Sequence, residues 1–416
     1  MSTEKSGYLV LMEPFMNFRR ITIYIASILV VVLINSCSDN TTTVATDTFE
    51  GGKLYKSSSG TFLVPVLSGS FKEMGRQYGL MLQDQIKEFY KVAVDDYLIA
   101  EKGIKYEDLV ESGLSCYSNF SALLRDYLDG MAETNGLGKE KTYILSEALP
   151  IIGFAGCSSL SAWDAYTTDG KTITGRNLDL PFPHLRRFSK YFNIIVWNPK
   201  ELPASVASID YIGGLFYQTA INSKGIFLEL QNGQNADTCN PPGRQNTNNI
   251  LLESLFMNVN SNEYDQWFET VLPEAGLIMN GSYPNHATIY EWATFRVAIR
   301  NGNGILSASN DFIDSSWVNY PIFFYDSTNE GIGKTWTRRT NLLNLGEQYK
   351  GEINPARMME ILDTDIPNGG ATFPESGFIK TIYSVVAKPS ELKIWLKVHE
   401  YSDWEEIDLK QIFTNQ

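Results

Sequence analysis

Two sequence motifs predict the centre of the fold: Gly156-Cys157-Ser158-Ser159 and, after a short interval, Gly170-Lys171-Thr172-Ile173-Thr174-Gly175-Arg176-Asn177-Leu178-Asp179. The dipeptide Asp169-Gly170 between them favours a tight turn between two β-rich runs. The pattern therefore predicts a hairpin whose two far ends meet, with Cys157 beside Arg176 and Asp179. Because a fixed cation beside a thiol increases its thiolate character, we expect Cys157 to be a nucleophile.

The chain before this hairpin, residues 54–156, is predicted to be mainly helical. Apolar residues recur three and four positions apart from Phe71 to Val92, which is the spacing of one helix face. Gly75 and Gly79 lie four apart on that helix and permit a close crossing of backbones. Further helices are expected at about Tyr106–Ser112, Ser118–Thr134 and Lys139–Leu149.

The chain after residue 156 is predicted to be rich in strands. Strands are expected at Tyr191–Asn198, Ala204–Ser208, Thr219–Asn222, Ile226–Asn232, 287–291, 295–299, 304–307, Thr381–Ala387, Glu391–Val398 and Trp404–Leu409. Helices are expected at Asn248–Met257, Tyr264–Leu272 and Pro355–Leu362. Runs of strands separated by helices indicate a layered α+β domain over residues 157–416.

Charge and motifs exclude several classes of function. The formal net charge of the 416-residue chain is −14, and no cluster of Lys and Arg appears, so a nucleic-acid partner is not expected. The chain has 3 histidines, which are isolated from one another, so no metal is expected. A glycine-rich nucleotide loop and a serine-hydrolase elbow are also missing, and we expect no cofactor.

These exclusions leave a reactive cysteine without an obvious side-chain base. An N-terminal cysteine needs none, because its own α-amino group, with a pKa of roughly 7.7 to 8.0, can accept the thiol proton. Cleavage at Gly156-Cys157 would create that amine. A Cys-His enzyme with an intact chain, using His184, is one alternative; a binding lipoprotein without catalysis is another.

The N-terminal residues indicate export. Asn17-Phe18-Arg19-Arg20 is basic and the run from Ile21 to Ile34 is apolar, at about the length of a signal-peptide core. Ile34-Asn35-Ser36-Cys37 resembles a bacterial lipoprotein cleavage site, with Cys37 as the lipidated residue; an uncleaved membrane-anchoring helix is the alternative. We therefore expect a signal peptide at 1–36, a disordered tether at 37–53, and a protein anchored outside the cytoplasm in the bacterial cell envelope.

Two further cysteines remain after Cys37 and Cys157 are assigned. Cys116 and Cys239 could form one disulfide, or both could be unpaired thiols, and spacing alone does not decide between the two.

The hairpin motifs resemble those of the N-terminal-nucleophile hydrolases. The Gly156-Cys157 junction with Gly175-Arg176-Asn177-Leu178-Asp179 is similar to the acyl-CoA:6-aminopenicillanic acid acyltransferase-like group, with choloylglycine hydrolases and acid ceramidases as more distant relatives. Phe71–Gly79 looks like the pro-segment helix of the same group. The resemblance implies a four-layer αββα sandwich, autocatalytic cleavage between Gly156 and Cys157, and no cofactor or metal.

The resemblance also implies roles for single residues. Arg176 and Asp179 match the residues that orient the thiol and hold the amine, and Asn232 matches a donor to the oxyanion. Asn310 matches a second site asparagine. A downstream arginine falls on Arg338 or Arg339, with Arg338 favoured. The alternatives are that Asn232 and Asn310 are turn residues and that Arg176 and Asp179 form a surface ion pair.

The function implied is a cysteine amidase or acyltransferase that acts on linear amide bonds of N-acylated small molecules through an acyl-enzyme. Aromatic residues near the hairpin favour an apolar acyl group, although many of them can belong to the core. Bile-acid conjugates, N-acyl amino acids, β-lactams and acylated lipids all stay open as substrates, as do hydrolysis and acyl transfer. The oligomeric state is not readable from the sequence.

Overall fold

The computed structural model describes residues 43–148, 156–180 and 183–414. All of them belong to one compact unit that spans Thr41–Gln416. The predicted signal peptide at 1–36 and Cys37 lie outside the described residues, so these assignments stay predictions.

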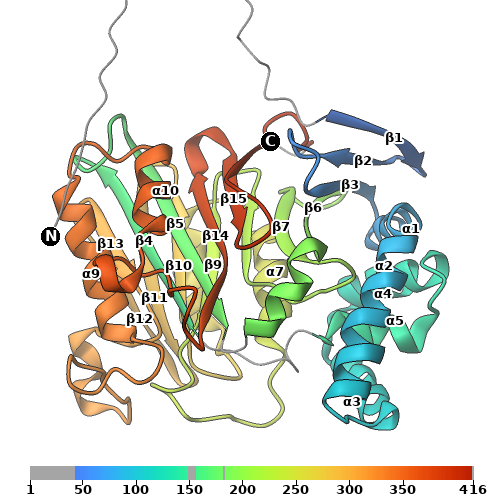
Figure 1. Cartoon of the computed structure of the whole chain (residues 1–416), viewed down its shortest axis with the longest axis horizontal. Coiled ribbons are helices and arrows are strands. Elements are labelled where there is room, and N and C mark those ends of the chain that lie inside the picture. Colours follow the sequence, from blue (N-terminus) through green and yellow to red (C-terminus); the bar gives the residue numbers. More distant parts are fainter. Residues whose placement is uncertain (1–42, 149–155, 181–182, 415–416) are drawn as a thin grey trace, which may run out of the picture. The chain divides into compact units, whose positions relative to one another are not determined.

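Two β-sheets form the centre of this unit (Figure 1). The larger sheet, sheet A, has ten strands, which pair antiparallel except for β3 and β6. In spatial order they are β1 Thr43–Phe49, β2 Gly52–Lys56, β3 Leu63–Gly69, β6 Phe192–Pro199, β7 Val206–Tyr211, β8 Thr219–Asn222, β9 Phe227–Asn232, β10 Leu277–Tyr283, β11 His286–Ala293 and β12 Arg296–Asn301.

The smaller sheet, sheet B, contains the predicted hairpin. Its six antiparallel strands are, in spatial order, β13 Ile305–Ala308, β4 Gly156–Asp164, β5 Gly170–Leu180, β14 Lys380–Lys388, β15 Lys393–Val398 and β16 Glu405–Asp408. Strands β4 and β5 pair with Gly156 opposite Asp179 and Cys157 opposite Leu178. Gly170 has φ +73, which a glycine adopts without strain in the turn between them. The predicted hairpin is confirmed, but residues 165–169 connect its strands, with Asp164 opposite Gly170, in place of a tight turn at Asp169-Gly170.

Helices cover the outer faces of both sheets. Helix α9, Thr335–Gln348, packs on β4, and α10, Pro355–Asp363, packs on β5 and β14 (Figure 1). Helices α7, Thr247–Met257, and α8, Ser261–Thr270, pack on sheet A. Buried side chains such as Arg176 and Glu229 join the inner faces of the two sheets. The predicted α+β fold, with layers in the order αββα, is therefore what the chain forms.

The helical segment before the hairpin packs, through its first helix, on β1, β2 and β3 at one end of sheet A. It comprises α1 Phe71–Met81, α2 Gln83–Tyr90, a π-helical segment Lys91–Glu101, α3 Tyr106–Asn119, α4 Ala122–Thr134 and α5 Lys139–Ser146. Ser70 begins α1 through a capping box with Glu73. A Cβ at Gly75 would lie 2.0 Å from the carbonyl oxygen of Tyr127, so the predicted close crossing, here of α1 over α4, is confirmed.

Three parts of the sequence prediction were wrong or incomplete. Strand β1, Thr43–Phe49, and the first residues of β2 fall inside the range 37–53 that was predicted to be a disordered tether. Strand β10 and helix α9 were not predicted. Cys116 and Cys239 are both free thiols, so the disulfide alternative does not hold.

Candidate active site

Hairpin pairing brings the predicted nucleophile into a buried position. Cys157 is 4% exposed, and the paired residue Leu178 lies between Asn177 and Asp179. Because side chains alternate along a strand, Cys157 and Arg176 face sheet A, whereas Gly156 and Asp179 face α9. The groups on one face of the hairpin therefore contact the sulfur of Cys157, and the groups on the other face contact its backbone nitrogen.

The face toward sheet A holds the sulfur. Nη2 of Arg176 donates to Sγ of Cys157 at 3.2 Å and to the carbonyl oxygen of Leu230 at 2.7 Å. Nη1 of Arg176 donates to the hydroxyls of Thr219 at 2.5 Å and Tyr383 at 2.6 Å. Both terminal nitrogens of this buried guanidinium thus have protein acceptors, which fixes its plane relative to the sulfur.

Glu229 completes this side and was missed by the sequence analysis. Its Oε2 forms an ion pair with Nε of Arg176 at 3.1 Å, and both side chains are 0% exposed. Asn280 on β10 donates to Oε1 of Glu229 at 2.9 Å. The available signal was a carboxylate inside the strand Phe227–Asn232, whose other side chains are mainly apolar.

The face toward α9 holds the backbone nitrogen. Oδ1 of Asn310 accepts the N–H of Cys157 at 2.9 Å and also accepts Nη2 of Arg338 at 2.8 Å. Nη1 of Arg338 forms an ion pair with Oδ2 of Asp179 at 3.1 Å, again between side chains that are 0% exposed. The bond between Gly156 and Cys157 therefore lies beside a second buried ion pair.

The remaining predicted residues divide into near and distant ones. The carbonyl oxygen of Asn232 accepts the side-chain N–H of Asn310 at 2.8 Å, while its Oδ1 accepts the N–H of Gln234. Asn232 therefore lies beside Asn310, which contacts Cys157. The side-chain oxygen of Asn232 accepts from Gln234, and its side-chain NH2 group is the part that could donate to an oxyanion. Arg339 pairs instead with Asp311, outside the contacts of Cys157.

Burial dominates the electrostatics of the site. Burial raises the pKa of the Cys157 thiol, and Arg176 opposes that rise. Burial also raises the pKa of Asp179 to about 6, although Arg338 and the Thr381 hydroxyl act to lower it. In the same way burial raises the pKa of Glu229 to about 7, although Arg176 acts to lower it. Two cations and two carboxylates cancel around the thiol, so an unprotonated sulfur would add a net negative charge to this interior.

The described histidines do not supply a base for the thiol. Nε2 of His399 lies 3.0 Å from the hydroxyl of Ser384, and burial lowers the pKa of His399 to about 4. His286 stacks on Tyr283. The side chain of His184 lies outside the described residues, so the Cys-His alternative stays a prediction.

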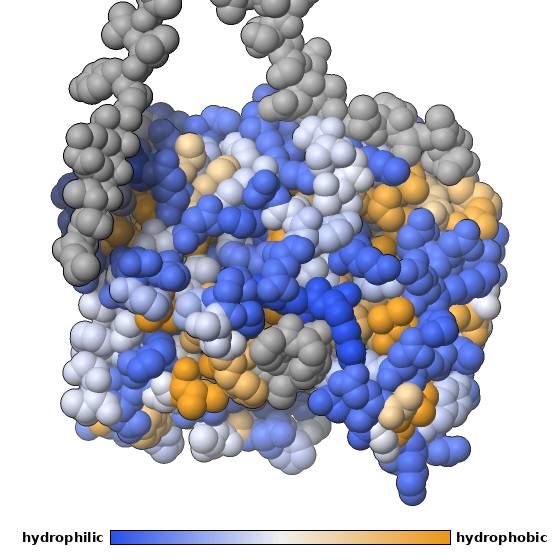
Figure 2. Space-filling model, viewed as in Figure 1, coloured by the Kyte–Doolittle hydropathy of each residue, from blue (hydrophilic) through white to orange (hydrophobic). Residues whose placement is uncertain are grey.

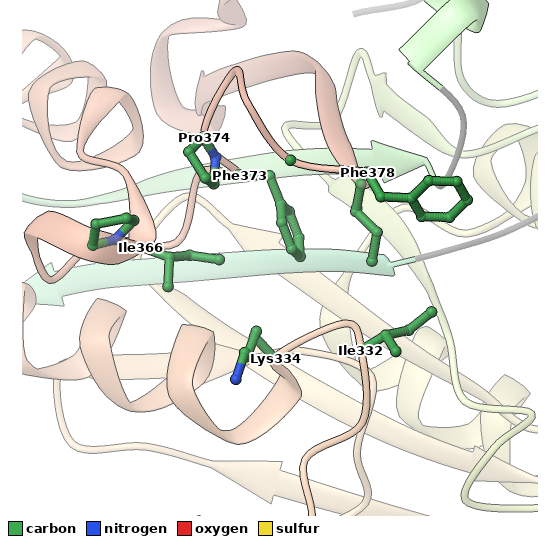
Figure 3. Close-up of a pocket in the computed structure, with 9 residues that line it drawn as sticks. Ile332, Lys334, Ile366, Phe373, Pro374 and Phe378 are labelled. Carbon is green, nitrogen blue, oxygen red and sulfur yellow. The ribbon is translucent and has the colours of Figure 1, made fainter.

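An apolar groove of about 350 Å³ adjoins the face toward α9 (Figure 3). Its lining residues come from the loop before α9 and the loop before β14: Ile332, Lys334, Ile366, Pro367, Phe373, Pro374, Gly377, Phe378 and Ile379. The ring centroid of Phe373 lies 5.4 Å from Cζ of Arg338, so the groove shares a wall with the cluster around Cys157. Ile332 and Phe378 are 78% and 63% exposed at its mouth.

Other kinds of site find no support in the described part of the chain. Residues 43–148, 156–180 and 183–414 contain no group of three or more His, Cys, Asp or Glu side chains that could hold a metal ion. Within the same ranges, no helix has the length and apolarity needed to cross a bilayer.

Comparisons with known proteins give structural similarity only. No protein-family model and no curated protein matches the chain. The fold is similar to a mutant of conjugated bile acid hydrolase from Clostridium perfringens, with 14% identity, a TM-score of 0.44, and 61% of this chain and 93% of the other covered. It is also similar to the Caenorhabditis elegans ortholog of N-acylethanolamine-hydrolyzing acid amidase, with 14% identity, a TM-score of 0.40, and 62% and 99% covered. A third similar structure is penicillin V acylase from Agrobacterium tumefaciens, with 12% identity, a TM-score of 0.42, and 61% of this chain and 87% of the other covered.

Proposed function

We propose that this chain is a cysteine amidase of the N-terminal-nucleophile type, which cleaves itself between Gly156 and Cys157 and then acts on N-acylated small molecules. One observation carries the proposal. The sulfur of Cys157 contacts one buried ion pair through Arg176, and its backbone nitrogen contacts another through Asn310 and Arg338. A cysteine with a purely structural role does not need charged groups at both its sulfur and its backbone nitrogen. A cysteine whose sulfur is the nucleophile and whose nitrogen is the base needs both atoms to be positioned.

In the proposed maturation, Sγ of Cys157 attacks the carbonyl carbon of Gly156. A carbon–sulfur bond forms, the carbon–nitrogen bond breaks, and the nitrogen of Cys157 gains the proton that the thiol loses. Water then attacks the thioester, which gives a carboxylate on Gly156 and restores the thiol. Asn310 accepts the N–H of the nitrogen that becomes the leaving amine, and Arg338 donates to the same Asn310 oxygen; this arrangement supports the proposal.

In the proposed turnover, the free amine of Cys157 takes the thiol proton as the sulfur attacks the substrate amide. The buried charges support this step, because the two ion pairs already cancel. Moving a proton from sulfur to nitrogen creates a positive and a negative charge together and leaves the net charge of the interior unchanged. The carbon–nitrogen bond of the substrate then breaks, the substrate amine leaves with the proton held by the Cys157 amine, and a thioester on Sγ remains. Water, or an amine if the enzyme is a transferase, attacks this thioester, takes the acyl group and restores the thiol.

The groove beside Arg338 supports a substrate with an apolar part. Apart from Lys334, whose ammonium pairs with Glu330 at 3.1 Å, the side chains that line it are uncharged. On the face drawn in Figure 2, hydrophobic residues form small groups between hydrophilic ones. An apolar group of limited size suits such a surface better than an extended apolar partner.

Intact mass spectrometry of the purified protein tests the proposal. We expect wild-type protein to give two fragments that divide before Cys157, and Cys157→Ala to give one uncut chain. The cut protein should release amine from N-acyl amides with apolar acyl groups, and pre-treatment with a thiol reagent should stop the release.

An active protein with an uncut chain would overturn the proposal. Loss of that activity in His184→Ala would favour the Cys-His alternative. Ligand binding that survives alkylation of Cys157, without turnover of any amide, would favour the binding lipoprotein.

The proposal includes a lipid anchor on Cys37 that holds the enzyme outside the cytoplasm in the bacterial cell envelope. The apolar run and Cys37 in the sequence support it. Membrane fractionation tests it: we expect wild-type protein in the membrane fraction and Cys37→Ala in the soluble fraction of the cell envelope. Equal partition of the two would contradict the anchor.

A further inference from the structure

Strand β14 contains an irregularity beside the site. Its pairing with β5 places Thr381 opposite Asp179 and Tyr383 opposite Leu178, so the register shifts at Ile382. Two residues on β14 oppose one on β5, which is a β-bulge. In a regular strand, positions 381 and 383 would point to the same face. With the extra residue they point to opposite faces of sheet B.

Thr381 faces α9 and contacts the ion pair on the nitrogen side. Its hydroxyl donates to Oδ1 of Asp179 at 2.6 Å, and Arg338 pairs with Oδ2 of the same carboxylate. The same hydroxyl accepts the N–H of Phe373 at 3.0 Å, and the Phe373 ring packs on the Arg338 guanidinium. Thr381 is 0% exposed, and its carbonyl oxygen accepts Nη2 of Arg186 at 2.6 Å. Its position is therefore fixed from three sides.

Tyr383 faces sheet A and contacts the ion pair on the sulfur side. Its hydroxyl accepts Nη1 of Arg176 at 2.6 Å and lies 2.8 Å from the hydroxyl of Thr219. Its ring centroid lies 5.6 Å from Cζ of Arg176. One strand segment of three residues thus contacts both ion pairs that surround Cys157.

We infer that the bulge at Ile382 allows Thr381 and Tyr383 to act as a pair of positioning residues. Thr381 orients Asp179 and, through it, Arg338, which donates to Asn310, the acceptor of the backbone N–H of Cys157. Tyr383 orients Arg176 toward the sulfur. Neither residue touches the reacting atoms. The inference rests on the proposed function, because it assigns separate supports to the nitrogen and the sulfur of the proposed nucleophile.

Thr381→Val tests the nitrogen side, since valine keeps the shape and removes the hydroxyl. We expect the rate of cleavage at Cys157 to fall about tenfold, as for a lost hydrogen bond to a charged group. The pH profile of Cys157 alkylation, followed by peptide mass spectrometry, should stay close to that of the wild type. Thr381→Ser should restore the cleavage rate, because it restores the hydroxyl.

Tyr383→Phe tests the sulfur side. The variant removes one of the two acceptors at Nη1, with the Thr219 hydroxyl as the other, and so weakens the orientation of the Arg176 guanidinium toward the sulfur. We expect the alkylation profile of Cys157 to move to higher pH, with kcat lowered and KM nearly unchanged. The exposed Cys239 thiol in the same digest is an internal control whose profile should not move.

Matched controls come from the helical segment. Thr142 is a buried threonine whose hydroxyl donates to the carbonyl oxygen of Gly138, and the Tyr143 hydroxyl donates to Asp129. Thr142→Val and Tyr143→Phe remove the same groups from α5, where the two hydroxyls donate to Gly138 and Asp129 and to neither ion pair beside Cys157. They should lower the melting temperature without changing cleavage rate or alkylation profile.

The outcomes separate this inference from the proposed function. Wild-type cleavage and amide hydrolysis, with Thr381→Val or Tyr383→Phe indistinguishable from the wild type or from the controls, would overturn the inference alone. Absence of cleavage in the wild type would overturn the proposed function. If Thr381→Val does not fold, Thr381→Ala gives the same test of the hydroxyl, and Tyr383→Phe tests the other half independently.

Discussion

The two buried ion pairs beside Cys157 are alike in geometry and differ in what they face. Each joins an arginine to a carboxylate at 3.1 Å with all four side chains 0% exposed. The pair of Arg176 and Glu229 lies between the sheets and contacts the sulfur, whereas the pair of Arg338 and Asp179 lies under α9 and contacts the nitrogen through Asn310. The difference suggests that the reactivity of the thiol and the departure of the amine can be changed separately.

Breaking the pair on the sulfur side should have the largest effect. Arg176→Gln leaves the Glu229 carboxylate buried without its cation, which costs roughly 3–5 kcal/mol when a buried pair loses one partner. We expect the free energy of unfolding in urea to fall by that amount. Alkylation of Cys157 should also slow, because no cation remains at the sulfur.

A double variant separates stability from reactivity. Arg176→Gln combined with Glu229→Gln replaces both charges by neutral amides, so the stability of the wild type should return in large part. The thiol should stay unreactive. Recovery of alkylation in the double variant would show that Arg176 acts on the fold and not on the sulfur.

Breaking the pair on the nitrogen side should have a smaller effect on stability. Asp179→Asn keeps an oxygen for the Thr381 hydroxyl and loses the charge beside Arg338, a change of roughly 1.5–3 kcal/mol. The negative charge of Asp179 raises the pKa of Cys157, so its loss should make the thiol more acidic. We expect slower cleavage, seen by intact mass, despite faster alkylation. A parallel fall in both rates would contradict a division of roles.

The hairpin was predictable from the sequence because its signals are local. The Asp169-Gly170 dipeptide between two β-rich runs signals a hairpin, which brings Cys157 near Arg176 and Asp179. The dipeptide does not set the register, because residues 165–169 connect the strands and the pairing shifts between Ala162 and Asp164. The positions of Asn310 and Arg338 come from contacts more than 150 residues away along the chain. Spacing does not encode such contacts, so for these residues only the family resemblance gave an expectation.

Two of the elements that were missed, α9 and β10, bury polar side chains among their apolar ones. Helix α9 buries Thr335, Arg338, Leu342 and Gly346 at helical spacing, and no side chain caps its first turn at Lys334, so neither periodicity nor a start signal was visible. In β10, Asn280-Gly281-Ser282 has the composition of a turn, yet Asn280 is buried and bonded to Glu229. Because Arg338 of α9 and Asn280 of β10 belong to or contact the two ion pairs, they occupy buried positions where apolar residues would have signalled a helix or a strand.

Gly156→Ala separates maturation from turnover, because it affects the nitrogen side before cleavage and not after it. A Cβ at residue 156 would lie 2.9 Å from Nη2 of Arg338 and 3.1 Å from Oδ1 of Asn310. We expect cleavage to slow by about tenfold, as for an overpacked site. Once cut, residue 156 is no longer bonded to Cys157, so kcat and KM of the isolated mature form should equal those of the wild type. A changed kcat in the mature form would contradict this assignment.

Another buried carboxylate, Glu147, has no arginine among the groups that set its pKa. Burial raises its pKa to about 7; the Cys116 thiol, which hydrogen-bonds to it, lowers the value, and the carboxylate of Glu274 raises it further. The pKa in the unfolded chain is lower, near that of a free glutamate. Its contribution to stability is therefore complete below about pH 4.3 and is lost as pH rises through about 7.

Urea unfolding tests this pH dependence. Between these pH values the free energy of unfolding should fall by at most about 1.4 kcal/mol per pH unit, and Glu147→Gln should flatten this slope. An unchanged slope in Glu147→Gln would assign the pH dependence to other carboxylates, with Asp210, whose pKa burial raises to about 8, as the next to replace.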